Sequence, residues 1–157
     1  MQRKGFDYGK TFSPVAKMTS IRVILAVAAH AGWTIHQMDV NSAYLNGEID
    51  QDILMSQPPG FRDLDFPNFL CLLGKSLYGI KQAGRLWYAV IKAFLLKIRF
   101  RQSDADPCVF IRTTEEGTVI IGLYVDDHSL YNSSTFCQNG LFWNFHLEKK
   151  KLGGRLT

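Results

Sequence analysis

The sequence predicts an α+β fold in which an antiparallel sheet carries helices on one face. Two segments have helical spacing, several short apolar segments look like strands, and the two kinds do not alternate regularly along the chain. Of the 157 residues, 46% are hydrophobic and 20% are charged, which is an ordinary globular composition, and the length suits one domain. We therefore expect a single domain spanning residues 1–157.

The first third of the chain predicts a helix followed by a strand. Residues 1–18 are interrupted by glycine and proline and should be irregular. Thr19 and Ser20 offer an N-cap for the helix IRVILAVAAHA, which ends at Gly32 and is apolar nearly all round, so that we expect it to be well buried. WTIHQMDV then alternates like a strand and brings Asp39 to the strand's C-terminal end, before a short turn or helical loop in NSAYLNG.

The rest of the chain predicts one more helix and several strands. Short strands are expected within DILMSQPPGF and FLCLLGKSLYG, and apolar residues at i, i+3 and i+4 make QAGRLWYAVIKAFLLKI an amphipathic helix. The turn TEEG joins CVFIRT and TVIIGLYV into a β-hairpin, and HSLY follows as a return strand. Residues 132–157 have no firm periodicity.

The net charge and the cysteine content indicate which kinds of partner and which cellular compartment suit the chain. The formal net charge of +4 and the pI of about 9.0 are compatible with a polyanionic partner. Three cysteines, odd in number and far apart, argue against a disulfide framework and against a zinc site, and they favour a reducing compartment. No apolar stretch is long enough to cross a bilayer, and the N-terminus has no apolar signal segment. We expect an intracellular protein, cytoplasmic or nuclear and not secreted, with no membrane partner.

Three aspartates end apolar strands and are the strongest candidates for a metal site. Asp126 and Asp127 follow the apolar run that begins at Val119, and Asp39 ends an earlier strand. If these strands are neighbours, three carboxylates converge and need a cation, for which oxygen ligands favour Mg²⁺ or Mn²⁺. The alternative is a solvated turn at the doublet and an unrelated Asp39. Four other acidic residues flank loops and turns, and we expect them to be solvated: Asp104, Asp106, Glu115 and Glu116.

Several ordered motifs resemble those of reverse transcriptases. GLYVDDHSL resembles the YVDD signature, QMDVNSAYLNGEI resembles the preceding metal-binding motif, and LYGIKQAGRLWY resembles the middle motif. TFSPVAKMTSIRVILAVAA, SQPPGF and RQSDADPCVFI resemble segments of copia-type LTR retrotransposon polyproteins. The resemblance covers residues 4–131 and leaves 132–157 as a poorly matching tail. It implies a truncated reverse transcriptase domain, with the palm and part of the fingers of a right-hand polymerase but without the thumb or RNase H.

This resemblance implies an RNA-directed DNA polymerase, a nucleotidyltransferase that adds a dNTP to a primer 3′-hydroxyl on an RNA or DNA template with two Mg²⁺ or Mn²⁺ ions. Asp39, Asp126 and Asp127 match its catalytic metal ligands, and Val40 belongs to the same site through its backbone N–H, which faces the triphosphate. Tyr44 matches the aromatic residue that stacks on the incoming sugar and excludes a 2′-hydroxyl.

Further residues are implied to bind the substrates. Tyr124 would lie under the primer terminus and the template, and Lys81 and Gln82 belong to the middle motif that lines the nucleotide and template. The longer basic block that the family carries in its fingers is reduced here to QRKGF, and Lys17 and Arg22 are candidate substitutes for its contacts to the triphosphate.

Gly84 stands where the middle motif of the family usually has proline. The shortened fingers block, the expected absence of a thumb and the irregular tail leave a second hypothesis open. The alternative function is therefore a catalytically inactive retrotransposon remnant that at most binds nucleic acid through its basic surface. Under either hypothesis, the expected partners include the remainder of the polyprotein, namely the thumb, RNase H and integrase.

Overall fold

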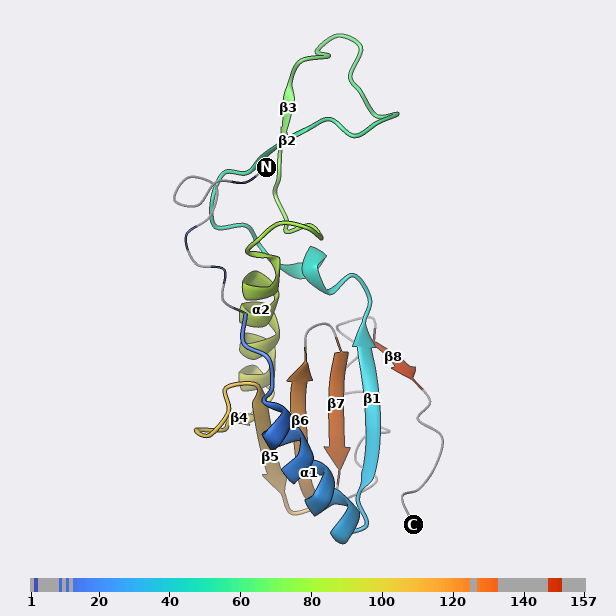
Figure 1. Cartoon of the computed structure of the whole chain (residues 1–157), viewed down its shortest axis with the longest axis vertical. Coiled ribbons are helices and arrows are strands. Elements are labelled where there is room, and N and C mark those ends of the chain that lie inside the picture. Colours follow the sequence, from blue (N-terminus) through green and yellow to red (C-terminus); the bar gives the residue numbers. More distant parts are fainter. Residues whose placement is uncertain are drawn as a thin grey trace. The chain divides into compact units, whose positions relative to one another are not determined.

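The computed structural model forms two compact units, each made of two stretches of the chain. One unit comprises Met1–Ser13 and Tyr44–Val90, and the other comprises Pro14–Ala43 and Ile91–Thr157. The structure describes residues 2, 9, 11, 13–124, 127–132 and 147–150, and for residues 38, 127–132 and 147–150 it describes the backbone alone. Figure 1 shows the ribbon with its elements labelled.

The unit that contains residues 14–43 is built on a six-stranded antiparallel sheet with the order β4-β5-β6-β7-β1-β8. The strands are β1 (Thr34–Val40), β4 (Arg101–Gln102), β5 (Val109–Thr114), β6 (Gly117–Tyr124), β7 (Asp127–Asn132) and β8 (Leu147–Lys150). The α+β class and the strands β1, β5, β6 and β7 are confirmed. The short strands β4 and β8 were not predicted.

Helix α1 (Met18–His30) packs on one face of this sheet through a narrow stripe. Ile24 and Ala28 are buried against Val109 of β5. The predicted burial of the whole helix is wrong, since Val23 is 62% exposed and Val27 is 45% exposed. A helix that covers a single sheet face can bury only the stripe that faces the sheet.

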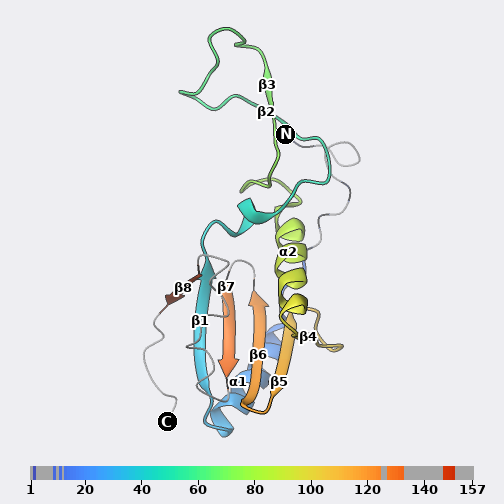
Figure 2. The ribbon, with the colours of Figure 1, turned by 180° about the vertical axis from the view of Figure 1, so that it is seen from behind.

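The opposite face of the sheet is covered by the C-terminal part of helix α2 (Ala83–Lys97) rather than left open. Figures 1 and 2 show α1 in front of the sheet in one view and behind it in the other, and the end of α2 on the reverse side. Leu95 and Phe110 are at most 1% exposed. Arg112, on the same strand face as Phe110, donates a hydrogen bond to the carbonyl of Ile98 at 3.2 Å. The helices therefore lie on two faces of the sheet, where the sequence predicted one.

The start of α1 is capped from a distant loop. The prediction of Thr19 or Ser20 as the N-cap is wrong, because the helix begins at Met18 and Lys17 is the N-cap residue, without a side-chain cap of its own. The Asp106 carboxylate accepts a hydrogen bond from the Lys17 N–H at 2.8 Å instead. Asp106 is 1% exposed, so the expectation that it is solvated is also wrong.

The other unit contains a two-stranded antiparallel sheet of β2 (Leu54–Ser56) and β3 (Leu70–Leu72), the first turns of α2, and most of a short 3-10 helix, η1 (Ala43–Asn46). These elements confirm the short strands and the helical loop that the sequence predicted. Among the described residues, no helix is long and apolar enough to cross a membrane.

Candidate active site

The register of three neighbouring strands brings together the motifs that carry the predicted metal ligands. β7 lies between β6 and β1, and its first residue, Asp127, is paired with Asp39 of β1 on one side and with Tyr124 of β6 on the other. Directly paired residues of antiparallel strands have Cα atoms about 4.5–5.5 Å apart. The strands of the two acidic motifs, separated by most of the chain, are therefore adjacent at the end where both motifs lie.

Among the described residues at these strand ends, Asp39 and Tyr124 are partly exposed and Val40 is buried. Asp39 is half-buried, and the next residue, Val40, ends β1 with 3% of its surface exposed. Tyr124, at the end of β6, is 43% exposed. Val125 and Asp126 lie outside the described residues, as does the side chain of Asp127. The place of Asp126 in the site therefore stays a prediction.

The middle motif is held to the N-terminal segment by one side chain. Gln2 accepts a hydrogen bond from the Lys81 N–H through Oε1 at 2.8 Å and donates from Nε2 to Oε1 of Gln82 at 3.0 Å. Gln82 is 1% exposed, whereas the side chain of Lys81 is exposed. Gln2 was not predicted as a site residue from the sequence. The one feature that could have indicated it is its place in the short QRKGF block.

Tyr44 lies in η1 and meets a second tyrosine from the middle motif. The ring centroids of Tyr44 and Tyr78 are 4.7 Å apart and the ring planes are inclined by 52°, a tilted arrangement that aromatic pairs favour. Tyr78 was not predicted as a site residue, although it lies within the recognised LYGIKQ block. The pairing depends on the fold, because 34 positions separate the two residues.

A protein-family model described as "Reverse transcriptase (RNA-dependent DNA polymerase)" matches residues 1–149. This chain belongs to the reverse transcriptase family. The match continues past Tyr131, where the resemblance recognised motif by motif ends.

The relatives of this reverse transcriptase are retrotransposon polyproteins. It is 50% identical over 126 residues to the "Retrovirus-related Pol polyprotein from transposon RE1" of Arabidopsis thaliana, covering 80% of this chain and 9% of that protein. It is 44% identical over 134 residues to the RE2 polyprotein of the same plant, covering 85% and 9%. It is 37% identical over 120 residues to the "Transposon Ty1-MR1 Gag-Pol polyprotein" of Saccharomyces cerevisiae, covering 76% and 6%. The chain thus spans less than a tenth of the length of each of these relatives. No solved structure matches it significantly.

Reverse transcriptases generally use divalent metal ions, and the donor chemistry at the strand ends suits them. Carboxylate oxygens are the ligands that Mg²⁺ and Mn²⁺ prefer, and the strand register pairs the backbone positions of two aspartates, Asp39 and Asp127. Among the described side chains, no three of the types His, Cys, Asp or Glu gather as a metal site. Two of the three expected carboxylates are outside that description, so the ion set stays a prediction.

The two basic residues suggested as replacements for the fingers block belong to the start of α1. The Lys17 ammonium donates a hydrogen bond to the Ala105 carbonyl at 3.1 Å, and its backbone N–H is bound to Asp106. Arg22 is exposed on α1. Their role as substrate-binding residues of the reverse transcriptase stays a prediction.

The loop around Asp106 has the clearest electrostatic perturbation in the described part of the reverse transcriptase. Burial raises the pKa of Asp106, but hydrogen bonds from the Cys108 N–H, the Ser20 hydroxyl and the Lys17 N–H outweigh it and hold the pKa below its ordinary value. Burial, together with the Asp106 charge, raises the pKa of the Cys108 thiol to about 12. The carboxylate is therefore ionised and the thiol is inert at neutral pH.

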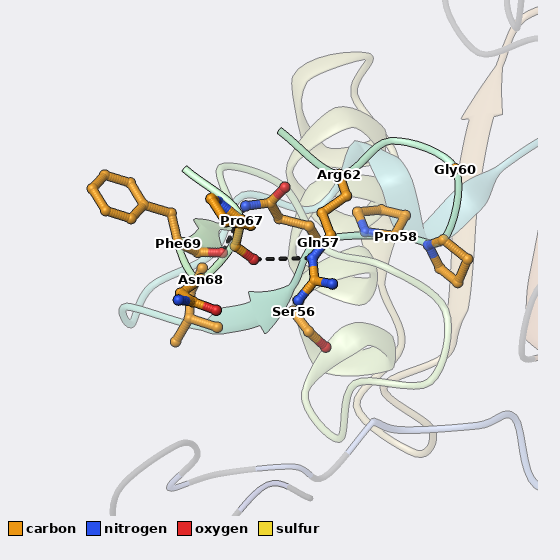
Figure 3. A pocket seen from close by; sticks show the side chains of 10 residues that line it. Ser56, Gln57, Pro58, Gly60, Arg62, Pro67, Asn68 and Phe69 are labelled. Carbon is orange, nitrogen blue, oxygen red and sulfur yellow. Dashed lines mark hydrogen bonds between the residues drawn. The ribbon is translucent and has the colours of Figure 1, made fainter. Parts of the chain in front are cut away.

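A cavity of about 390 Å³ lies in the long turn between β2 and β3 (Figure 3). Gln57 donates to the Phe69 carbonyl at 2.9 Å, and Arg62 donates to the Pro67 carbonyl at 3.0 Å. These lining side chains thus hold the turn itself. None of the predicted site residues is among the described residues that line this cavity.

Proposed function

We propose that this chain is the polymerase part of a reverse transcriptase, which transfers a nucleotidyl group from a dNTP to a primer 3′-hydroxyl on an RNA or DNA template. One observation supports it above the others: the register that sets Asp39 opposite Asp127 at the ends of β1 and β7. Two motifs of one enzyme family, far apart in sequence, lie at directly paired backbone positions of neighbouring strands, and this supports a cation shared between them. In this proposal the six-stranded sheet serves as the palm of a right-hand polymerase, and the unit that contains β2 and β3 serves as part of the fingers.

In the proposed reaction, the carboxylates of Asp39, Asp126 and Asp127 would hold two divalent cations where the end of β1 lies beside the start of β7. Bound there, the cations supply activation of the primer hydroxyl and neutralisation of charge on the phosphates. The protein contributes position more than covalent chemistry, as is usual in phosphoryl transfer. Burial of the Val40 side chain keeps the backbone N–H of the same residue in place, from which it would donate to the triphosphate.

The remaining residues bind the substrates. Tyr124 is exposed enough to lie under the primer terminus, and Tyr44 forms the wall beside the incoming sugar. Lys81, with an exposed ammonium, contacts phosphate, while the buried Gln82 supports the segment that carries it. Lys17 and Arg22 add positive charge for the triphosphate. In the organism the domain works as part of a longer polyprotein that supplies the thumb, RNase H and integrase.

Primer extension tests this proposal. The wild-type chain is given a primer annealed to RNA or DNA, all four dNTPs and Mg²⁺ or Mn²⁺, and extension is expected. Asp39→Asn and Asp126→Asn should each abolish it, because each removes an anionic ligand, whereas Asp104→Asn should leave it unchanged, since Asp104 is exposed and outside the predicted site. Extension that survives both site variants would overturn the assignment of the aspartates.

Metal binding has a readout that does not need turnover. Mn²⁺ at about 100 times its dissociation constant should stabilise the wild-type chain by about 2.7 kcal/mol in thermal unfolding. The same Mn²⁺ should have little effect on Asp39→Asn and its full effect on Asp104→Asn. Equal Mn²⁺ stabilisation of all three proteins would contradict a cation at Asp39.

The same experiments also test the alternative, that the chain is a catalytically inactive retrotransposon remnant. It would bind an RNA–DNA duplex in a salt-dependent manner through its basic surface, without extension of the primer. That result would leave the family membership intact and remove polymerase activity from this chain.

A further inference from the structure

The contact between Tyr44 and Tyr78 lies within one compact unit, and two backbone hydrogen bonds lie beside it. Gly47 donates a hydrogen bond to the Tyr44 carbonyl at 3.1 Å and so closes the turn that carries this tyrosine. Ser76 donates to the Gly47 carbonyl at 2.8 Å, two residues before Tyr78. The two ring-bearing segments are thus tied together by backbone next to both tyrosines.

The close approach of these segments depends on a missing side chain. A Cβ added to Gly47 would lie 2.9 Å from the Leu86 Cβ and 3.3 Å from the Ser76 Cβ, both in the same unit. Glu48 and Lys75 extend the contact through an isolated antiparallel bridge. Because the backbone beside both tyrosines is packed this tightly, the Tyr78 ring is held in contact with the Tyr44 ring.

Tyr78 itself lies at the surface of this unit. It is 54% exposed, and Gly79 follows with φ of +94°, a conformation that favours glycine, so the chain turns sharply just after the ring. Tyr44 is half-buried, with Tyr78 against it. A half-exposed aromatic ring that leans on a second aromatic ring is suited to support it from one side.

We propose that Tyr78 is a positioning residue for sugar selection, which acts by holding the ring of Tyr44. This inference rests on the proposed polymerase function, in which Tyr44 excludes the 2′-hydroxyl of a ribonucleotide. To reject a nucleotide with one additional hydroxyl, the Tyr44 ring must keep its position beside the sugar. A tyrosine ring in contact with a second ring has fewer rotamers available than one without such a contact. Removal of the Tyr78 ring leaves space into which Tyr44 turns, and ribonucleotides are then accepted.

The test compares single-nucleotide extension with dCTP and CTP opposite template guanine. For Tyr78→Leu, the ratio of kcat/KM for dCTP to that for CTP should fall about tenfold, mainly through a lower KM for CTP. Tyr78→Phe keeps the ring and should retain the wild-type ratio. Phe61→Leu removes an aromatic side chain that is 83% exposed elsewhere in the same unit, and it should change nothing.

A double variant shows whether Tyr78 acts through Tyr44. Tyr44→Ala should lower the ratio strongly, and adding Tyr78→Leu to it should lower the ratio no further, because the ring that Tyr78 supports is already gone. A ratio within twofold of wild type for Tyr78→Leu, beside a collapsed ratio for Tyr44→Ala, would overturn the positioning role while the polymerase assignment survives.

Failure of the polymerase proposal is recognised separately, by absence of extension from the wild-type chain with dCTP. In that case the role of Tyr78 is tested by the affinities of dCTP and CTP, measured in the presence of Mn²⁺ without any turnover. Tighter binding of dCTP than of CTP, lost in Tyr78→Leu and kept in Tyr78→Phe, supports it. Equal affinities for the two nucleotides in the wild-type chain refute it.

Discussion

Replacement of Asp106 by asparagine should destabilise the chain far more than its position in a surface loop would indicate. The Asp106 carboxylate is 1% exposed and accepts from the Cys108 N–H at 2.9 Å and the Lys17 N–H at 2.8 Å, with the Ser20 hydroxyl as a third donor. The lowered pKa means that the folded chain favours the charged carboxylate, so these hydrogen bonds outweigh the cost of burial.

The magnitude follows from what asparagine cannot do. Its amide keeps one oxygen as a neutral acceptor, but its NH₂ group faces a backbone N–H donor and leaves that donor unpaired. Hydrogen bonds to charged groups contribute about 1.5–3 kcal/mol each, and loss of a helix cap costs about 1 kcal/mol. We expect Asp106→Asn to lower the free energy of unfolding by about 2–4 kcal/mol, a large part of the 5–15 kcal/mol typical of a domain.

Urea unfolding at pH 7, followed by far-UV circular dichroism, measures this loss. Asp104→Asn is the matched control, because Asp104 is the same residue type two positions away with an exposed side chain, and its effect should stay within about 0.5 kcal/mol. If the two variants lose the same stability, the capping role of Asp106 is wrong.

The stability that Asp106 contributes should also depend on pH in one direction. A carboxyl whose folded pKa is depressed stabilises the fold above its unfolded pKa, here ordinarily 3.8, and loses that contribution as the pH falls through the lower folded value. The difference in urea midpoint between wild type and Asp106→Asn should therefore be constant from pH 7 to about pH 5 and shrink below pH 3.8. A difference that grows on acidification would refute the sign.

Two further predictions follow from packing in the described residues. Gly47→Ala should destabilise the chain by about 1–3 kcal/mol in urea unfolding, because the new Cβ meets Leu86 at 2.9 Å, whereas Gly74→Ala, with nothing within 4 Å, should have almost no effect; equal midpoints would contradict the clash. Cys108, buried and with a pKa raised to about 12, should resist iodoacetamide at pH 8 until urea unfolds the chain, while the half-buried Cys71 reacts first in peptide mass mapping. Equal rates at the two thiols would show that the Cys108 site opens in the native state.

The elements that the sequence predicted well are those whose signal is local. Alternation over seven residues defines β1, and with it the place of Asp39 near a strand end, because successive side chains of a strand point to opposite faces. The i, i+3, i+4 repeat of α2 and the TEEG turn between β5 and β6 are equally local. The family motifs depend on residue identities alone, so they too were readable before any fold was known.

Other features depended on which segments meet, and the sequence misjudged or missed them. α1 is apolar nearly all round, yet its exposed side at Val23 and Val27 is decided by the sheet covering only one stripe of it. The partner of Tyr44 is Tyr78, and nothing in either residue's neighbourhood indicates the other.

The amino-acid sequence by itself determined the family, the α+β class and the strand ends where the acidic motifs lie. Only the tertiary structure decided that Asp127 is paired with Asp39 and that the cap of α1 comes from Asp106, a residue 89 positions from the Lys17 N–H that it binds. The physical reason is range: periodicity and turn chemistry act over a few residues, whereas register and burial arise only when distant segments pack and leave a buried polar group to be paired.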